Sequence, residues 1–142
     1  MKNVKIKVIL SVFMIFVTLF SSSLTTLAAS QLTTYYAIVG IRESTDSFYC
    51  SSGTIYVYNN TKPDKYYDGN LRLKLYSVEN GVVYSYITIS LPAAGQTKSS
   101  TLHWDYVPSG NYFIGFEYVP NDPSSTVYPS ISVWGQVFDG PQ

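Results

Sequence analysis

Cysteine and histidine are almost absent from the sequence, which contains only Cys50 and His103. A single cysteine cannot close a disulfide within the chain, so in an oxidising compartment the domain must be stabilised by its apolar core. One histidine and one cysteine are also too few for a zinc site with spaced ligands. Because calcium-loop and nucleotide-binding motifs are lacking as well, the sequence predicts no metal site and no cofactor.

Positive charge is scarce outside the first residues of the chain. All nine Asp and Glu residues follow residue 30, whereas three of the nine Lys and Arg residues precede it, namely Lys2, Lys5 and Lys7. The six basic and nine acidic groups that remain give a net charge of −3. This sign disfavours a nucleic-acid partner, because nucleic-acid binders neutralise phosphates with clustered Lys and Arg.

The apolar run near the N-terminus is too short for a membrane span. It extends from Val8 to Phe20, whereas a transmembrane helix needs roughly 20 residues. Lysines precede this run, and small residues ending in Ala28 and Ala29 follow it, as in a cleavable secretory signal peptide. We therefore predict that residues 1–29 are a signal peptide of bacterial type, with an uncleaved anchor as the alternative. The mature protein is expected to be secreted and extracellular, without a membrane span.

Helical periodicity is missing after Ser30. Short runs of β-branched and aromatic residues recur there, separated by Gly, Pro, Asn, Asp and Ser, which is typical of an all-β domain. We predict a single domain over residues 30–142, about 113 residues, enough to bury about two-thirds of the surface of the unfolded chain. Seven strands are expected, over residues 34–41, 54–58, 71–78, 82–91, 97–104, 112–119 and 130–137. This count favours an immunoglobulin-like antiparallel β-sandwich.

The clearest local pattern is a β-hairpin. Leu71, Leu73 and Leu75 alternate with polar or aromatic residues, and Ile87 and Ile89 alternate in the same way on the returning segment. Between the two segments, an Asn-Gly pair at 80–81 accepts the positive φ of a tight turn. One side of the hairpin is therefore predicted to face the core and the other to face solvent.

A stretch of about a dozen residues resembles known secreted domains. A Pro-Ser-Gly turn at 108–110 leads into Asn111, Tyr112, Phe113 and Ile114. This stretch resembles the turn and tyrosine that open the penultimate strand of immunoglobulin-like and fibronectin-type domains. The resemblance implies a sandwich fold and transfers no function. Antibody-type domains are excluded, because their disulfide pair is missing.

Two local patterns bear on catalysis. The Cys-Ser-Ser-Gly segment at 50–53 resembles the surroundings of the nucleophile in small secreted cell-wall peptidases, where the cysteine opens a helix. A predicted strand follows here instead of a helix. His103 and Asp105 share one face of another predicted strand, but the sequence lacks the Gly-x-Ser-x-Gly elbow of a serine nucleophile. We therefore predict no catalytic residue. For Cys50 a buried inert thiol, an intermolecular disulfide and a reactive thiol stay open.

Tyrosine is the residue in excess, with fourteen copies that all follow residue 30. If the hairpin leucines face inward, the tyrosines that alternate with the core residues of the hairpin face outward. In an immunoglobulin-like strand order the last two strands join the same sheet, so their outward residues extend this aromatic surface. A flat aromatic surface with polar neighbours suits sugar rings or a protein partner. Alternatively, the rings only stabilise an exposed sheet through cross-strand pairs. The predicted binding residues are Arg72, Lys74, Tyr76, Tyr84, Tyr86, Phe113 and Trp134.

Together these features predict a secreted, non-enzymatic β-sandwich. It is expected to bind an extracellular partner, a cell-envelope glycan or a protein, through the aromatic face of one sheet. A structural, matrix, bacteriocin-like or inhibitor protein is one alternative. A cysteine-dependent cell-wall hydrolase is the other.

Overall fold

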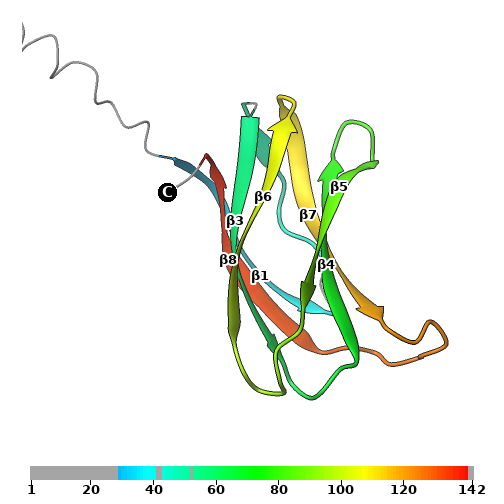
Figure 1. The fold of residues 1–142 in the computed structure, drawn as a ribbon. Helices are drawn as coiled ribbons and strands as arrows, with labels where there is room; N and C mark the ends of the chain where they lie inside the picture. Colours follow the sequence, from blue (N-terminus) through cyan, green and yellow to red (C-terminus); the bar gives the residue numbers. More distant parts are fainter. Residues whose placement is uncertain (1–28, 41–42, 52, 141–142) are drawn as a thin grey trace, which may run out of the picture.

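Two antiparallel four-stranded sheets pack face to face in the computed structural model, which describes residues 29–40, 43–51 and 53–140 (Figure 1). These residues contain no helix, and so none that is long and apolar enough to cross a membrane. The predicted signal peptide lies outside the described residues, apart from Ala29. The strands are β1 (Ser30–Val39), β2 (Phe48–Cys50), β3 (Gly53–Pro63), β4 (Gly69–Ser77), β5 (Val83–Ser90), β6 (Lys98–Val107), β7 (Gly110–Pro120) and β8 (Ile131–Asp139).

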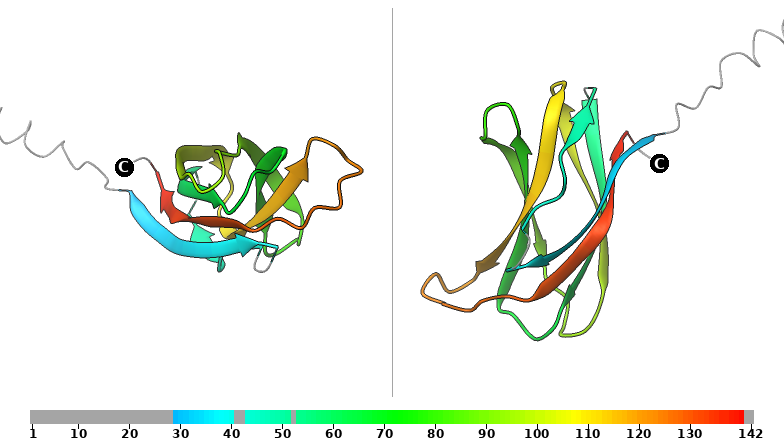
Figure 2. Two further views of the ribbon diagram at one scale, coloured as in Figure 1. Left: turned by 90° about the horizontal axis from the view of Figure 1, so that it is seen from below. Right: turned by 180° about the vertical axis from the view of Figure 1, so that it is seen from behind.

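The strand order is β1-β8-β3-β6 in one sheet, called sheet A below, and β2-β7-β4-β5 in the other, called sheet B. Four of the hydrogen-bonded pairs join strands at mirrored positions in the sequence: β1 with β8, β2 with β7, β3 with β6 and β4 with β5. The chain is thus arranged as one long hairpin, closed at β4–β5 and folded over on itself (Figure 2). This is the order of an eight-stranded jelly roll.

The predicted all-β sandwich is confirmed, but the strand order differs from that of an immunoglobulin domain. There the last two strands lie in one sheet. Here β8 lies between β1 and β3, while β7 lies between β2 and β4 in the opposite sheet. The prediction also missed the three-residue strand β2. Local patterns identify a strand but do not determine its distant partner, and the partner of β8 decides the topology.

The predicted hairpin is confirmed as β4–β5. Leu71 lies opposite Ile89 and Leu73 opposite Ile87. All three leucines of β4 are fully buried, and Gly81 in the connecting turn has a φ of 62°, which glycine adopts without steric cost. This hairpin contributes the inward face of sheet B to the core.

Strand β3 extends to Pro63, five residues beyond the predicted end at Tyr58. Asn59 and Thr61 face the core, with exposed fractions of 1% and 0%. The Tyr35 hydroxyl donates to Asn59 Oδ1 at 2.8 Å, and Asn59 Nδ2 donates to Thr61 Oγ1 at 2.8 Å. Because these groups bond to one another, the sandwich tolerates polar side chains inside it. Because both side chains are polar, the sequence pattern ended the predicted strand at residue 58.

Stability at alkaline pH depends on this buried network. Burial raises the pKa of the Tyr35 hydroxyl above its ordinary value of 10. Above about pH 10 the unfolded chain ionises this group and the folded protein does not. The free energy of unfolding should therefore fall by up to about 1.4 kcal/mol per pH unit. Burial also raises the pKa values of Tyr67, Tyr112 and Tyr118, which add to the fall.

Tyr35→Phe is expected to make this alkaline fall less steep. At pH 7 the free energy of unfolding of the same variant should be lower by about 1–3 kcal/mol, because Asn59 Oδ1 loses its hydrogen-bond donor. Urea unfolding curves between pH 7 and pH 11.5 measure both effects. An unchanged slope above pH 10 in the variant would contradict the role of the Tyr35 hydroxyl.

Candidate functional site

The outward face of sheet B combines aromatic and charged side chains. Three cross-strand pairs between β4 and β7 form its centre: Arg72 with Glu117, Lys74 with Gly115, and Tyr76 with Phe113. The β4 residues point outward because the leucines that alternate with them are buried in the core. Tyr86 of β5 lies opposite Lys74 and extends the surface. We call the set Arg72, Lys74, Tyr76, Tyr86, Phe113, Gly115 and Glu117 the sheet B face.

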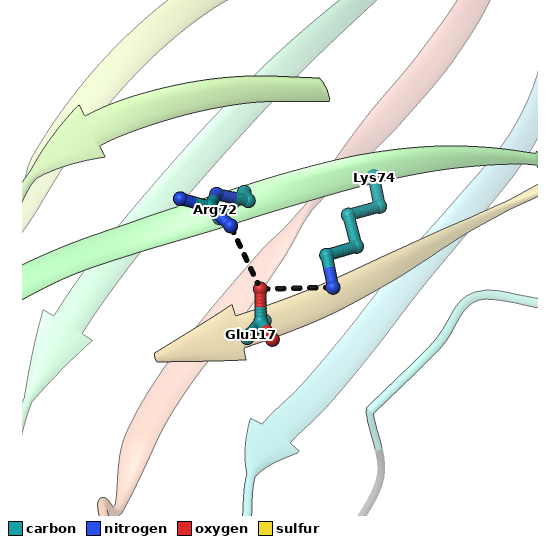
Figure 3. Close-up of polar contacts among 3 residues, drawn as sticks. All are labelled: Arg72, Lys74 and Glu117. Atoms are coloured by element: carbon teal, nitrogen blue, oxygen red, sulfur yellow. Dashed lines mark hydrogen bonds and ion pairs between the residues drawn. The ribbon is translucent and has the colours of Figure 1, made fainter. Parts of the chain in front are cut away.

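One carboxylate holds both cations of this face. Glu117 Oε2 lies 2.9 Å from Lys74 Nζ and 3.4 Å from Arg72 Nη1 (Figure 3). The Arg72 guanidinium carbon also lies 4.8 Å from the centre of the Tyr86 ring. Partly exposed ion pairs of this kind add little stability, about 0–1 kcal/mol. Their main effect is to fix the directions of donors and acceptors on the surface, with one positive charge in excess.

The aromatic part of the face is a pair of stacked rings. Tyr76 and Phe113 have ring centres 4.8 Å apart and planes inclined by only 4°. Tyr76 also lies against Gly115, where a Cβ atom would come within 2.8 Å of Tyr76 Cε2. A glycine at this position therefore leaves room for the edge of the tyrosine ring, where a larger side chain would collide with it.

Beside these rings is an open hollow of about 360 Å³. This size is within the range of roughly 300–1,000 Å³ that is common for small-ligand pockets. Hydrogen-bond donors, acceptors and an aromatic ring therefore surround one space. Its lining residues are Glu43, Ser44, Lys74, Tyr76, Phe113, Gly115, Phe116 and Glu117.

The far rim of the hollow comes from the segment that precedes β2. The backbone N–H of Phe116 donates to the Glu43 carbonyl at 2.7 Å, and the Thr45 N–H donates to the Ile114 carbonyl at 2.8 Å. These bonds bring Glu43 and Ser44 to the edge of the hollow. Sequence reasoning missed both residues, because their position depends on pairing with a strand about 70 residues away.

Trp134 is not part of the sheet B face, contrary to the prediction. It lies on β8 in sheet A, opposite Tyr36 of β1 and Asn60 of β3. The prediction placed β8 next to β7, but β8 forms hydrogen bonds with β1 and β3 instead. The aromatic residues are therefore divided between two outer surfaces on opposite sides of the sandwich.

Tyr84 also departs from the predicted surface. A β-bulge pairs Tyr76 with Val83 instead of Tyr84. The Tyr84 hydroxyl donates to the Tyr106 carbonyl of β6 at 3.0 Å, and its ring meets the core residue Tyr112 edge-on at 6.3 Å. Tyr84 therefore connects the two sheets along the β5–β6 edge. Of the seven predicted residues, the sheet B face brings together Arg72, Lys74, Tyr76, Tyr86 and Phe113.

The residues considered for catalysis lie in different environments. Cys50 of β2 is fully buried in the core between the two sheets. His103 is exposed on sheet A, where its ring stacks on Tyr56 with centres 5.6 Å apart. His103 Nε2 lies 3.5 Å from Asp105 Oδ2, which confirms that the two share a face. In the described part of the chain, no group of three or more His, Cys, Asp or Glu residues is arranged to hold a metal ion.

A second hollow, of about 430 Å³, lies beside the loop that follows β7. Its polar groups bond mainly within the loops themselves. The Tyr118 hydroxyl donates to the Asp68 carbonyl at 3.0 Å, and Asn121 Nδ2 donates to Asp68 Oδ1 at 2.7 Å. Ser124 donates through its N–H and its hydroxyl to Asp122, which lowers the pKa of that carboxyl. These hydrogen bonds explain the polar residues here, because they hold the loops in place.

Comparison with protein-family models and with curated proteins gives no function for this chain. No protein-family model matches the chain, and no curated protein matches it in sequence. A fold shared with many unrelated proteins does not define an activity, so the interpretation rests on the surface residues.

Proposed function

We propose that the protein is a secreted, non-enzymatic domain that binds a cell-envelope glycan on the sheet B face. The observation that carries this proposal is the Tyr76 ring, which is stacked with Phe113, packs against Gly115 and lines the hollow. The flat ring offers a surface for the apolar C–H face of a sugar. Lys74 offers donors and Glu117 offers acceptors for hydroxyl groups at fixed positions.

A protein partner is the second candidate, and the outer part of the same face favours it. Tyr86 is 58% exposed with Arg72 packed on its ring. Tyr49 of β2, at the opposite edge of sheet B from β5, is 59% exposed. Tyrosine and arginine are enriched among the residues that dominate protein–protein binding energy. A protein partner would use Tyr49 and Tyr86, which do not line the hollow, whereas a bound sugar would use Tyr76 and Lys74.

Retention on purified bacterial cell wall tests the glycan proposal. Tyr76→Ala is expected to weaken retention by about 1 kcal/mol or more, roughly fivefold, because the stacking surface is lost. Lys74→Met, which keeps most of the side-chain volume, should also weaken retention. The matched control is Tyr128→Ala, which removes an equally large ring that is 91% exposed outside the site. Sedimentation with the cell-wall particles measures all four proteins.

Wild-type retention by folded Tyr76→Ala and Lys74→Met proteins would overturn the glycan proposal. Loss of retention in Tyr86→Ala alone, or loss of wild-type retention after protease treatment of the wall, would instead favour the protein partner. Circular dichroism of each variant separates loss of binding from loss of fold.

Export is a separate part of the proposal and is supported by the first 29 residues. The lysines, the apolar run and the small residues before Ser30 follow the plan of a signal peptide. N-terminal sequencing of protein from the culture medium should find Ala29 or Ser30 as the first residue. Recovery of the chain with Met1 intact from a membrane fraction would rule out cleavage.

A further inference from the structure

The outer face of sheet A carries a third hollow, on the opposite side of the sandwich from the sheet B face. Its volume is about 540 Å³, and it is lined by Tyr36, Lys62, Ser132 and Trp134. Trp134 lies opposite Tyr36 across β8 and β1, and Ser132 lies opposite Lys62 across β8 and β3. The small Ser132 side chain therefore leaves a depression between larger neighbours. Tyr36 is 60% exposed, so its ring is available to a ligand.

Lys62 gives this hollow an uncompensated positive charge. Among the residues that the structure describes, it is the only charged one in the lining. In the described part of the chain its side chain takes part in no hydrogen bond or ion pair. On the sheet B face, by contrast, Glu117 already binds two cations. The sheet A hollow is therefore electrostatically suited to an anionic group.

The net charge of the domain does not oppose this local attraction. The value of −3 is the sum over six basic and nine acidic groups that are distributed through the chain after residue 30. At physiological ionic strength, charges separated by more than about 8 Å are largely screened. The charge that a ligand meets in the hollow is therefore set by Lys62, because no acidic residue of the described chain lines the hollow.

Two features together specify the chemistry of the occupant. The rings of Trp134 and Tyr36 suit the apolar face of a pyranose ring. A polymer of phosphate and glycerol has no such face. The Lys62 ammonium suits a carboxylate, which a neutral sugar lacks. We propose that the sheet A hollow binds an acidic polysaccharide, with a uronic-acid ring against Trp134 and Tyr36 and its carboxylate on Lys62. This site stands independently of the sheet B face.

Polygalacturonate and its fully methyl-esterified form provide a matched pair of probes, because their sugar rings are the same and they differ only at the carboxyl group, which is charged in the acid and a neutral methyl ester in the other form. The wild-type protein should bind the acid form roughly fivefold more tightly than the ester in affinity electrophoresis at low salt. Lys62→Met should abolish this difference. Trp134→Ala should weaken binding of both forms about tenfold or more. In 0.5 M NaCl the preference for the acid form should largely disappear.

Lys62 is exposed, so Lys62→Met keeps the fold and the test does not depend on the behaviour of Trp134→Ala. Tyr128→Ala, which removes an exposed ring outside both faces, serves as the matched control and should bind polygalacturonate like the wild type. Equal affinity of the wild-type protein for the two forms, or no affinity for either, would overturn the proposal. A Lys62→Met protein that still prefers the acid form would do the same. Loss of binding in Tyr76→Ala alone would assign the acid to the sheet B face instead.

Discussion

Leu73→Ala is expected to lower the free energy of unfolding by about 2–5 kcal/mol. Leu73 is fully buried at the centre of β4, which lies between β7 and β5 in sheet B. The substitution removes three carbon atoms from a packed interior and leaves a cavity that the surrounding strands fill only in part. Urea denaturation followed by tyrosine and tryptophan fluorescence measures the loss.

Tyr86→Ala is the matched control for Leu73→Ala in the same hairpin. Its ring lies on the outer face, so its removal should cost up to about 1 kcal/mol, the value of cross-strand contacts. If the two variants were equally destabilised, the assignment of inward and outward faces in β4 and β5 would be wrong. The whole sheet B face depends on that assignment.

Gly135→Ala is expected to destabilise the protein by about 3 kcal/mol or more, the upper end of the usual cost of overpacking. A Cβ atom at this position would overlap the backbone carbonyl oxygen of Tyr58 on the adjacent strand. It would also come within 2.8 Å of the Tyr35 hydroxyl, which belongs to the buried polar network. Because the closest atom is backbone, the clash cannot be relieved by rotating a side chain. Thermal or urea unfolding measures the effect.

Gly110→Ala is the control for this substitution. A Cβ atom on Gly110 would meet its nearest neighbour at 3.5 Å, an ordinary contact distance. We therefore expect a change below about 1 kcal/mol. Equal stability of the Gly135→Ala and Gly110→Ala proteins would mean that β8 and β3 are not as closely paired as the structure has them.

The sequence was informative where the structure depends on neighbouring residues. Alternating Leu71, Leu73 and Leu75 gave the faces of the hairpin correctly, because the side-chain period of a strand is a local property. The tyrosine after the Pro-Ser-Gly turn also makes a local contact, because the Tyr112 hydroxyl donates to the Pro108 carbonyl at 2.9 Å.

The sequence was uninformative where the structure depends on distant pairing. No residue near Trp134 in the sequence indicates that β8 lies between β1 and β3. The position of Trp134 on sheet A could therefore not be predicted. Asn59 and Thr61 look like loop residues until Tyr35, 24 residues before Asn59, supplies a buried hydroxyl. The rim residue Glu43 likewise reaches the hollow only through pairing with β7.

The most direct test of the central claim is a map of the glycan contact on the folded protein. Backbone amide chemical shifts can be measured before and after addition of soluble cell-wall glycan fragments. We predict that the largest changes occur at Lys74, Tyr76, Gly115 and Glu117, which surround the hollow of the sheet B face. Changes confined to the loop hollow, at residues 66–68 and 122–127, with none on β4 and β7, would contradict the proposed site.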